Sequence, residues 1–270
     1  MSKVKNAFVN KKAFIPFVTA GDPSLEITEH LIIKMEEAGA DLIEIGIPFS
    51  DPVAEGIVIQ QADERALKAG TTTDKIFQMV ERVRRKVDVP LAFMTYINPI
   101  YTYGIEKFFK NCNEFRIDAI IVPDLPFEEK NEIKPFCLKY GVDLISLIAP
   151  TSHDRIKMIA KEADGFVYCV SSMGVTGVRS EIKTDLREMV KLVKEAQNIP
   201  CAIGFGISTP EQAKEMSKYA DGVIVGSAIV KIVAQYGEDC VEPVFEYVKK
   251  MKDAITNGSK IGDNAVCAIV

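Results

Sequence analysis

The stretch LIEIGIPFSDPVAEG, residues 42–56, places one carboxylate, Glu44, inside an apolar run typical of a buried β-strand. Side chains of a strand alternate between its two faces, so Leu42, Glu44 and Gly46 share one face while three isoleucines share the other. The β-branched face suits packing against helices. Glu44 is therefore expected to point into the interior of a sheet that closes on itself, near the carboxyl end of its strand.

A buried, unpaired carboxylate costs several kcal/mol, so it is either neutralised by a raised pKa, paired within the structure, or kept for chemistry. The structural alternative is an ion pair inside the fold. None of the eight strands predicted below contains a Lys or Arg that could supply the partner. The pattern therefore favours a catalytic role for Glu44.

Short apolar runs alternate with helical patterns along the whole chain. Continuous apolar runs of this length are typical of strands buried on both faces of a parallel sheet. The segments between them carry apolar residues at three- and four-residue spacing, which predicts amphipathic helices. The predicted strands are 14–21, 41–49, 90–96, 118–126, 143–150, 165–172, 200–208 and 221–229.

A weak internal repeat supports the same architecture, because an acid stands just before the strand that follows a helix in AGADLIEIG, FRIDAIIV, YGVDLISL, EADGFVYC and YADGVIVG. Eight right-handed βα units close into a (β/α)8 TIM barrel, an α/β fold. The alternative, a doubly wound open sheet, usually shows a GxGxxG at its first βα turn, where this chain has TAGDPS. We predict a single barrel domain over residues 1–256 and a mobile tail over 257–270.

Composition narrows the class of protein. The chain has 270 residues and a net charge of −5, with acids and bases mixed and no basic stripe, which argues against nucleic acid and a membrane surface as partners. The start shows no apolar signal-peptide core, and no run of about 18 apolar residues could span a bilayer. Six scattered cysteines without a CxxC pair are expected to be reduced thiols of a cytoplasmic protein.

The loops that follow the last three predicted strands are rich in glycine and small hydroxyl residues: Gly177, Gly206, Gly226 and Ser227. In a barrel, the last two of these loops and a short extra helix commonly bind phosphate, because glycines let backbone N–H groups approach the anion. GSAIVKIVAQYG, begun by Ser227, is typical of such a helix. The alternative is that the glycines only form tight turns.

The sequence lacks the residues that two other kinds of carbon–carbon bond chemistry require. A Schiff-base aldolase needs a lysine on a strand, and metal-dependent aldol chemistry needs several histidines, of which the chain has two. Proton transfer by carboxylates on a phosphorylated substrate remains. Glu55 is a candidate second carboxylate, with a solvated loop acid as the alternative. Asp51 and Asp124 are equally compatible with turn formation.

Seven motifs then resemble one family, the α subunit of tryptophan synthase, in order and spacing over residues 10–250. They are PFVTAGDP (16–23), IEIGIPFSDPVAEG (43–56), TYINPI (95–100), VPDLP (122–126), GVTG (174–177), GFGIS (204–208) and GSAIVK (226–231). The resemblance implies retro-aldol cleavage of indole-3-glycerol phosphate to indole and glyceraldehyde 3-phosphate in tryptophan biosynthesis, with Glu44 as the acid–base residue.

The resemblance also implies the rest of the site. Phe17, Tyr96, Tyr168 and Phe205 would surround the indole and the catalytic acid. Gly177, Gly206, Gly226 and Ser227 would hold the phosphate, and Thr176 would hold its loop closed over the substrate. Glu55 stands where the family often has Asp, the carboxylate that contacts the indole N–H, and Ile57 stands where it often has Pro. An extra methylene moves that carboxylate by more than about an ångström, a displacement on a scale that can cost about 100-fold in rate.

The family α subunit works with a β subunit in an αββα heterotetramer. By resemblance, loops 50–56, 98–104 and 124–128 would form the docking surface, and pyridoxal phosphate would belong to the β partner, leaving no cofactor on this chain. Two alternatives stay open. One is a stand-alone lyase or another phosphate-binding barrel, and the other is a non-enzymatic barrel that activates a β subunit, which only Glu55 favours.

Overall fold

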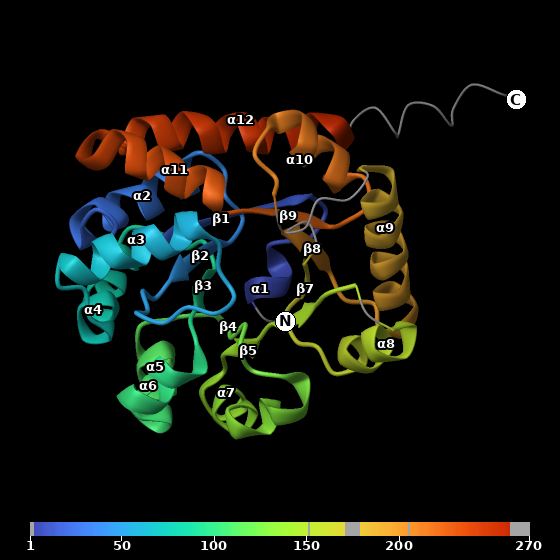
Figure 1. The fold of residues 1–270 in the computed structure, drawn as a ribbon, viewed down its shortest axis with the longest axis horizontal. Helices are drawn as coiled ribbons and strands as arrows, with labels where there is room; N and C mark the ends of the chain where they lie inside the picture. The colour runs from blue at the N-terminus through green and yellow to red at the C-terminus, as the bar shows by residue number, and fades with distance from the viewer. Residues whose placement is uncertain (1–2, 151, 171–178, 205, 260–270) are drawn as a thin grey trace, which may run out of the picture.

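The computed structural model describes residues 3–150, 152–170, 179–204 and 206–259 (Figure 1). Within them, each predicted strand range overlaps an observed strand. The observed strands are shorter, because the predicted ranges continue into the apolar loops that follow. They are β1 (Ala13–Thr19), β2 (Ile43–Gly46), β3 (Leu91–Met94), β4 (Ala119–Ile121), β5 (Asp143–Leu144), β6 (Ser146–Ile148), β7 (Val167–Val170), β8 (Cys201–Gly204) and β9 (Gly222–Val225).

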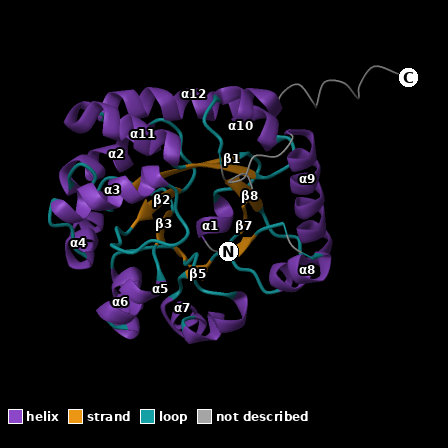
Figure 2. Ribbon diagram, viewed as in Figure 1, coloured by secondary structure: helices purple, strands orange, loops and turns teal. Residues whose placement is uncertain are grey.

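All neighbouring strands pair in parallel, in the order β5-β4-β3-β2-β1-β9-β8-β7-β6. The two ends of this order, β5 and β6, are separated in the chain by Ile145 alone. The Ile145 N–H donates to the carbonyl of Ile120 at 2.9 Å, and β6 continues to pair with β7. The fifth predicted strand is thus two short pieces, and through them the ring closes into the predicted (β/α)8 barrel (Figure 2).

Helices other than α1 surround the ring on its outer face, and α1 lies within the ring in the view of Figures 1 and 2. Two helices, rather than one, connect β2 to β3 and β3 to β4. The helices are α1 (Lys3–Asn6), α2 (Leu25–Glu37), α3 (Ile57–Lys68), α4 (Thr73–Val83), α5 (Ile97–Tyr103), α6 (Ile105–Glu114), α7 (Lys134–Tyr140), α8 (His153–Lys161), α9 (Arg179–Ala196), α10 (Pro210–Ser217), α11 (Ser227–Tyr236) and α12 (Val241–Ser259), with 3-10 turns η1 (Phe127–Glu132) and η2 (Gly237–Asp239).

The alternation predicted for β2 is confirmed. Ile43, Ile45 and Ile47 belong to the large apolar cluster between the ring and the helices, whereas Leu42 belongs to the cluster inside the ring. The last helix, α12, packs against α2, α10 and α11 and runs through Ser259. It therefore includes the first residues of the predicted tail, and residues 260–270 lie outside the described part of the chain.

The amino ends of the strands, here called the bottom of the barrel, are closed by the chain's own start. Val4, Ala7 and Phe8, in and after α1, pack into the interior cluster. The rings of Phe8 and Phe166 lie 5.4 Å apart, and a side chain at Gly222 would come within 2.9 Å of the Phe8 ring. The sequence analysis did not predict this apolar plug. The carboxyl ends of the strands lie at the opposite end of the barrel, here called the top.

The repeated acids before the strands have a structural purpose at the bottom of the barrel. Three of them accept a backbone N–H at the start of the neighbouring strand, which fixes strand to strand in register. The bonds are Phe14 N–H to Asp41 Oδ2 at 2.7 Å, Leu91 N–H to Asp118 Oδ2 at 3.0 Å and Cys201 N–H to Asp221 Oδ2 at 2.8 Å.

The five cysteines in the described ranges are buried and form no disulfide with one another, and Cys267 lies outside those ranges. Among the helices described, none combines the length and apolar character needed to cross a membrane.

Candidate active site

Glu44 lies inside the barrel, towards the top. It sits on β2, opposite Phe17 of β1 and Ala92 of β3, and its exposed fraction is 0 %. Neither carboxyl oxygen has a hydrogen-bond partner among the described residues. Burial without a compensating charge raises the pKa of Glu44 to about 8. The carboxyl group is therefore protonated at neutral pH and able to give up a proton.

Two of the predicted aromatic residues lie beside this acid, in space that glycines provide. A Cβ at Gly46 would come within 2.6 Å of the Phe17 ring, and one at Gly204 within 2.5 Å of the Tyr168 hydroxyl. Removal from water raises the pKa of Tyr168 well above its usual value, and the charge of Glu44 raises it further. Gly204 was not among the predicted site residues, although it opens the GFGIS motif that was recognised.

The second predicted acid, Glu55, lies on the loop after β2 and contacts a third predicted residue, Tyr96. The Ala54 N–H donates to the Tyr96 hydroxyl at 3.0 Å, and that hydroxyl donates to the Glu55 carboxyl. Burial raises the pKa of Glu55, and it raises the pKa of Tyr96 to about 12. The Phe49 ring packs on Tyr96 at 5.3 Å between centroids.

A third acid of this end, Asp63 on α3, was not among the predicted site residues. It is 4 % exposed and forms a hydrogen bond with the Glu55 carboxyl. Burial, followed by the charge of Glu55, raises the pKa of Asp63 to about 8, while the N–H of Phe49 works in the opposite direction. A helical pattern alone could not show that this buried position meets a loop acid.

The predicted phosphate loops are brought together in part. Strands β8 and β9 pair, so the loops that follow them are neighbours. Gly206 has φ +70°, a conformation that favours glycine, and Gly226 caps α11, which begins at Ser227 as expected. The first N–H groups of a helix have no partner within it, so this end can bind an anion. Thr176, Gly177 and Phe205 lie outside the described residues.

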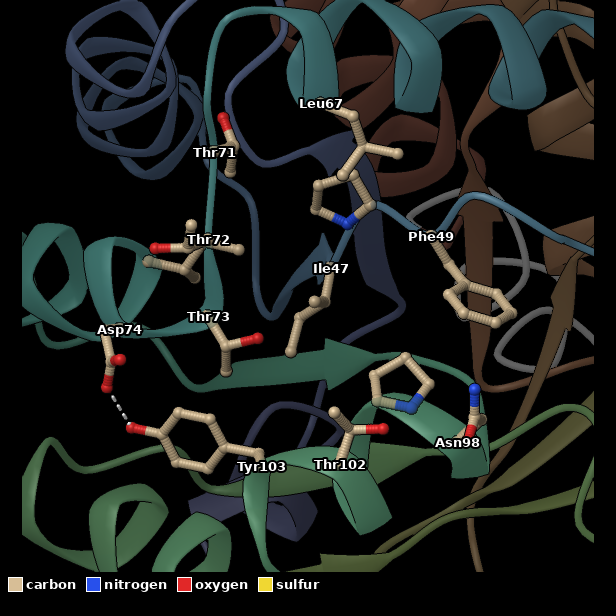
Figure 3. A pocket seen from close by; sticks show the side chains of 13 residues that line it. Ile47, Phe49, Leu67, Thr71, Thr72, Thr73, Asp74, Asn98, Thr102 and Tyr103 are labelled. Atoms are coloured by element: carbon tan, nitrogen blue, oxygen red, sulfur yellow. Dashed lines mark hydrogen bonds between the residues drawn. The ribbon is translucent and has the colours of Figure 1, made fainter.

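A separate hollow of about 360 Å³ lies beside the barrel mouth, between the loop after β2, the start of α4 and α5 (Figure 3). Thr71, Thr72, Thr73 and Thr102 line it, and the Tyr103 hydroxyl donates to Asp74 at 2.5 Å. None of its described lining residues is a predicted site residue. The hollow therefore contributes no group to the chemistry around Glu44.

Within the described ranges, no group of three or more His, Cys, Asp or Glu could hold a metal ion. The fold and the site define a class of protein, a (β/α)8 barrel with an unpaired acid at its carboxyl end next to loops suited to an anion. This is the arrangement of barrel enzymes that perform acid–base chemistry.

Comparison with known proteins identifies the family within this class. The family model described as "Tryptophan synthase alpha chain" matches residues 2–256. The tryptophan synthase alpha chain of Lacticaseibacillus casei is 47 % identical over 255 residues, covering 94 % of this chain and 96 % of that protein. The chain therefore belongs to the tryptophan synthase alpha chain family, as its motifs indicated.

Solved structures agree. The alpha chain from Legionella pneumophila superposes with a TM-score of 0.86 at 34 % identity, covering 97 % of this chain and 99 % of that one. A chain from the tryptophan synthase α2β2 complex of Pyrococcus furiosus superposes with a TM-score of 0.82 at 37 % identity, covering 89 % and 98 %. The barrel fold predicted from the sequence is thereby confirmed.

Proposed function

We propose that this chain is the α component of tryptophan synthase and cleaves indole-3-glycerol phosphate to indole and glyceraldehyde 3-phosphate. The observation that carries the proposal is Glu44, a fully buried acid without a hydrogen-bond partner among the described residues, which lies beside Phe17 and Tyr168 in a barrel of this family. An acid with its pKa raised to about 8 is matched to proton transfer near neutral pH.

The reaction follows from the position of this proton. Glu44 protonates the indole ring carbon that bears the glycerol side chain, which turns the ring into an electron acceptor. The hydroxyl on the adjacent side-chain carbon then loses its proton. The carbon–carbon bond breaks, its electron pair returns to the ring, and the side-chain carbon becomes the aldehyde of glyceraldehyde 3-phosphate. Glu44, now ionised, accepts the hydroxyl proton, so the acid is restored.

Glu55 assists from the other side of the ring. Positive charge develops on the indole nitrogen when the ring carbon is protonated, and a carboxylate that accepts the N–H stabilises that charge. Glu55, next to Tyr96, is the residue assigned to this contact. The extra methylene relative to the Asp common in the family is accommodated by a loop that Tyr96 and Gln60 hold, through Ala54 N–H and the Glu55 carbonyl.

The phosphate lies at the end of the barrel formed by Gly206, Gly226 and Ser227. Three further assignments, to Gly177, Thr176 and Phe205, rest on the sequence motifs. In this arrangement the phosphate and the indole N–H hold the two ends of the substrate, which places the scissile bond between them and next to Glu44. Orientation of this kind is a major part of the rate enhancement in such enzymes.

The partner is a β subunit in an αββα heterotetramer in the cytoplasm. Loops 50–56, 98–104 and 124–128 form the docking face. Val53, 80 % exposed, and Tyr101, 40 % exposed, are the large apolar side chains that support this assignment, because such residues anchor interfaces. Pyridoxal phosphate belongs to the β partner, and the reaction of this chain is carried by its own side chains without a cofactor.

The test is release of indole from indole-3-glycerol phosphate by the purified chain, measured alone and with a β subunit, beside Glu44→Gln. We expect slow release alone, faster release with the partner, and loss of about 1,000-fold or more in the variant, the scale of general acid–base catalysis. Binding of glycerol 3-phosphate by the variant controls for folding. Release by Glu44→Gln at a rate near that of the wild type would overturn the mechanism.

A further inference from the structure

Two carboxyl groups, Glu55 and Asp63, meet at the top of the barrel, and no described Lys or Arg forms an ion pair with either of them. Glu55 and Asp63 share a hydrogen bond, and the nearby guanidinium, Arg65, is occupied by both oxygens of Asp22 at 2.8 Å. Two carboxylates at hydrogen-bond distance cannot both be ionised at little cost, so such a pair holds one proton. The groups around the pair decide which acid keeps it.

Asp63 is the member that keeps the proton. It is almost fully buried on α3, and the negative charges of Glu55 and Asp22 both oppose its ionisation. Glu55 receives the hydrogen bond of the Tyr96 hydroxyl, which favours its charged form. At neutral pH a protonated Asp63 therefore donates to an ionised Glu55, consistent with a pKa of Asp63 of about 8.

Only one oxygen of Glu55 is used in these contacts, because Oε2 is buried and has no hydrogen-bond partner in the described part of the chain. An unused carboxylate oxygen in such a place is an acceptor available to a ligand. Next to it, Ile59 and Ala62 of α3 pack with Phe17, so the helix that carries Asp63 also borders the barrel mouth. The pair thus leaves one buried acceptor unused in the described part of the chain, beside a helix that packs against Phe17.

We propose that Asp63 is a positioning residue, whose shared proton holds the Glu55 carboxylate beside Tyr96 so that Oε2 can accept the N–H of a heteroaromatic ring. The inference rests on the proposed function, since that function supplies the indole. It adds a second acid to the recognition of the ring, and it gives a reason why a longer Glu, rather than Asp, is tolerated on this loop.

The test uses indole and benzofuran, which have nearly the same shape but differ in the ring N–H. Dissociation constants are measured by calorimetry at neutral pH with glycerol 3-phosphate present. A hydrogen bond to a carboxylate should make wild-type protein bind indole about 10-fold more tightly than benzofuran. The ratio of the benzofuran dissociation constant to the indole dissociation constant therefore measures the N–H contact, because a general loss of pocket structure would weaken both ligands alike.

Three variants separate positioning from packing. Asp63→Leu removes the donor and should reduce the ratio to about 1, whereas Asp63→Asn, whose amide still donates, should keep most of it. Glu64→Gln serves as the matched control. Glu64 is the exposed acid that follows Asp63 in the chain, and its carboxyl group pairs with Lys68 at 3.6 Å. Circular dichroism and glycerol 3-phosphate binding establish that Asp63→Leu is folded.

The pH dependence gives an independent reading. As the pH rises above about 8, Asp63 loses its proton and repels Glu55, so the wild-type ratio should fall. In Asp63→Asn the ratio should persist, although Glu44 titrates in the same range in both proteins. A wild-type ratio that survives in Asp63→Leu, or equal pH profiles in wild type and Asp63→Asn, would overturn the role of Asp63 alone. A wild-type ratio near 1 would overturn the assigned contact of Glu55, and this inference with it.

Discussion

The carboxylates at the two ends of the barrel have opposite surroundings. At the bottom, Asp41, Asp118 and Asp221 each accept a backbone N–H of a neighbouring strand, and each also pairs with a cation. The cations are Lys252, Arg84 and Lys194, each at 2.6 Å. At the top, Glu44 has no hydrogen-bond partner within the described part of the chain, and Glu55 and Asp63 form a hydrogen bond with each other.

The difference separates stability from chemistry within one residue type. An acid that is ionised, hydrogen-bonded and paired stabilises the strand register and has no proton to exchange. An acid that is buried without a cation destabilises the fold but holds a proton at neutral pH. In (β/α)8 barrels the bottom face serves stability and the top face serves catalysis, and these acids divide in the same way.

The largest effect on stability is expected from Asp118 at the bottom. Its partner Arg84 has a side chain only 4 % exposed, and loss of the negative charge leaves that cation buried without a counter-charge. Asp118→Ala should lower the free energy of unfolding by about 3 to 5 kcal/mol, measured by urea denaturation. Asp118→Asn, which retains an acceptor for the Leu91 N–H, is the matched control and isolates the charge. A loss below about 1 kcal/mol in Asp118→Ala would contradict a stabilising role for this end.

The pH dependence of stability should come from the buried acids at the top, because the pKa values of both Asp63 and Glu44 are raised to about 8. Of these two, Glu44 can be isolated by substitution. Its pKa rises from about 4.5 in the unfolded chain to about 8 in the folded one, so between these values the folded state holds a proton that the unfolded state has lost. Stability is therefore greatest below the lower value and decreases as the pH rises, by up to about 1.4 kcal/mol per pH unit from this group.

The reference for that measurement is Glu44→Gln, which is neutral at every pH. The wild type should lose stability relative to the variant as the pH rises from about 4.5 to about 8, and the difference should level off above that. Unfolding free energies of both proteins, measured across this pH range, test whether the wild type loses stability relative to the variant as the pH rises. Parallel curves would show that folding does not raise the pKa of Glu44.

The smallest effect is expected from Asp221, also at the bottom but nearer to solvent. Its side chain is 33 % exposed and that of Lys194 is 36 % exposed, so water and salt screen the pair. Asp221→Asn keeps an acceptor for the Cys201 N–H and should cost less than about 1 kcal/mol in urea denaturation. A cost equal to that of Asp118→Asn would show that exposure does not set the strength of these pairs.

Much of the fold could be predicted from the sequence, because it follows from local patterns. Alternation along residues 42–47 placed Glu44 inside the barrel, and the acids before the strands marked the βα repeat. The division of the fifth strand at Ile145 and the plug by Phe8 were not predicted. Both depend on contacts between segments distant in the sequence, which periodicity does not report.

The residues of the site that stand in a strand pattern or in a family motif could also be predicted from the sequence. Glu44 stood out because a charge interrupted an apolar strand, and the roles of Phe17, Tyr96 and Glu55 came from the family motifs. Asp63 lies in an ordinary amphipathic helix, and nothing in its spacing indicates that it meets the Glu55 loop. Its burial beside another acid becomes visible only when the loop and the helix are placed together.

Glu44 is a neutral acid at working pH because burial disfavours its charged form and no described residue supplies a counter-charge. Isotope-edited NMR of the Glu44 carboxyl, assigned by its absence in Glu44→Gln, measures its titration directly in the folded chain. We expect a midpoint near 8. A midpoint near the ordinary value of 4.5 would contradict this expectation, because Glu44 would then be ionised at neutral pH and have no proton to deliver.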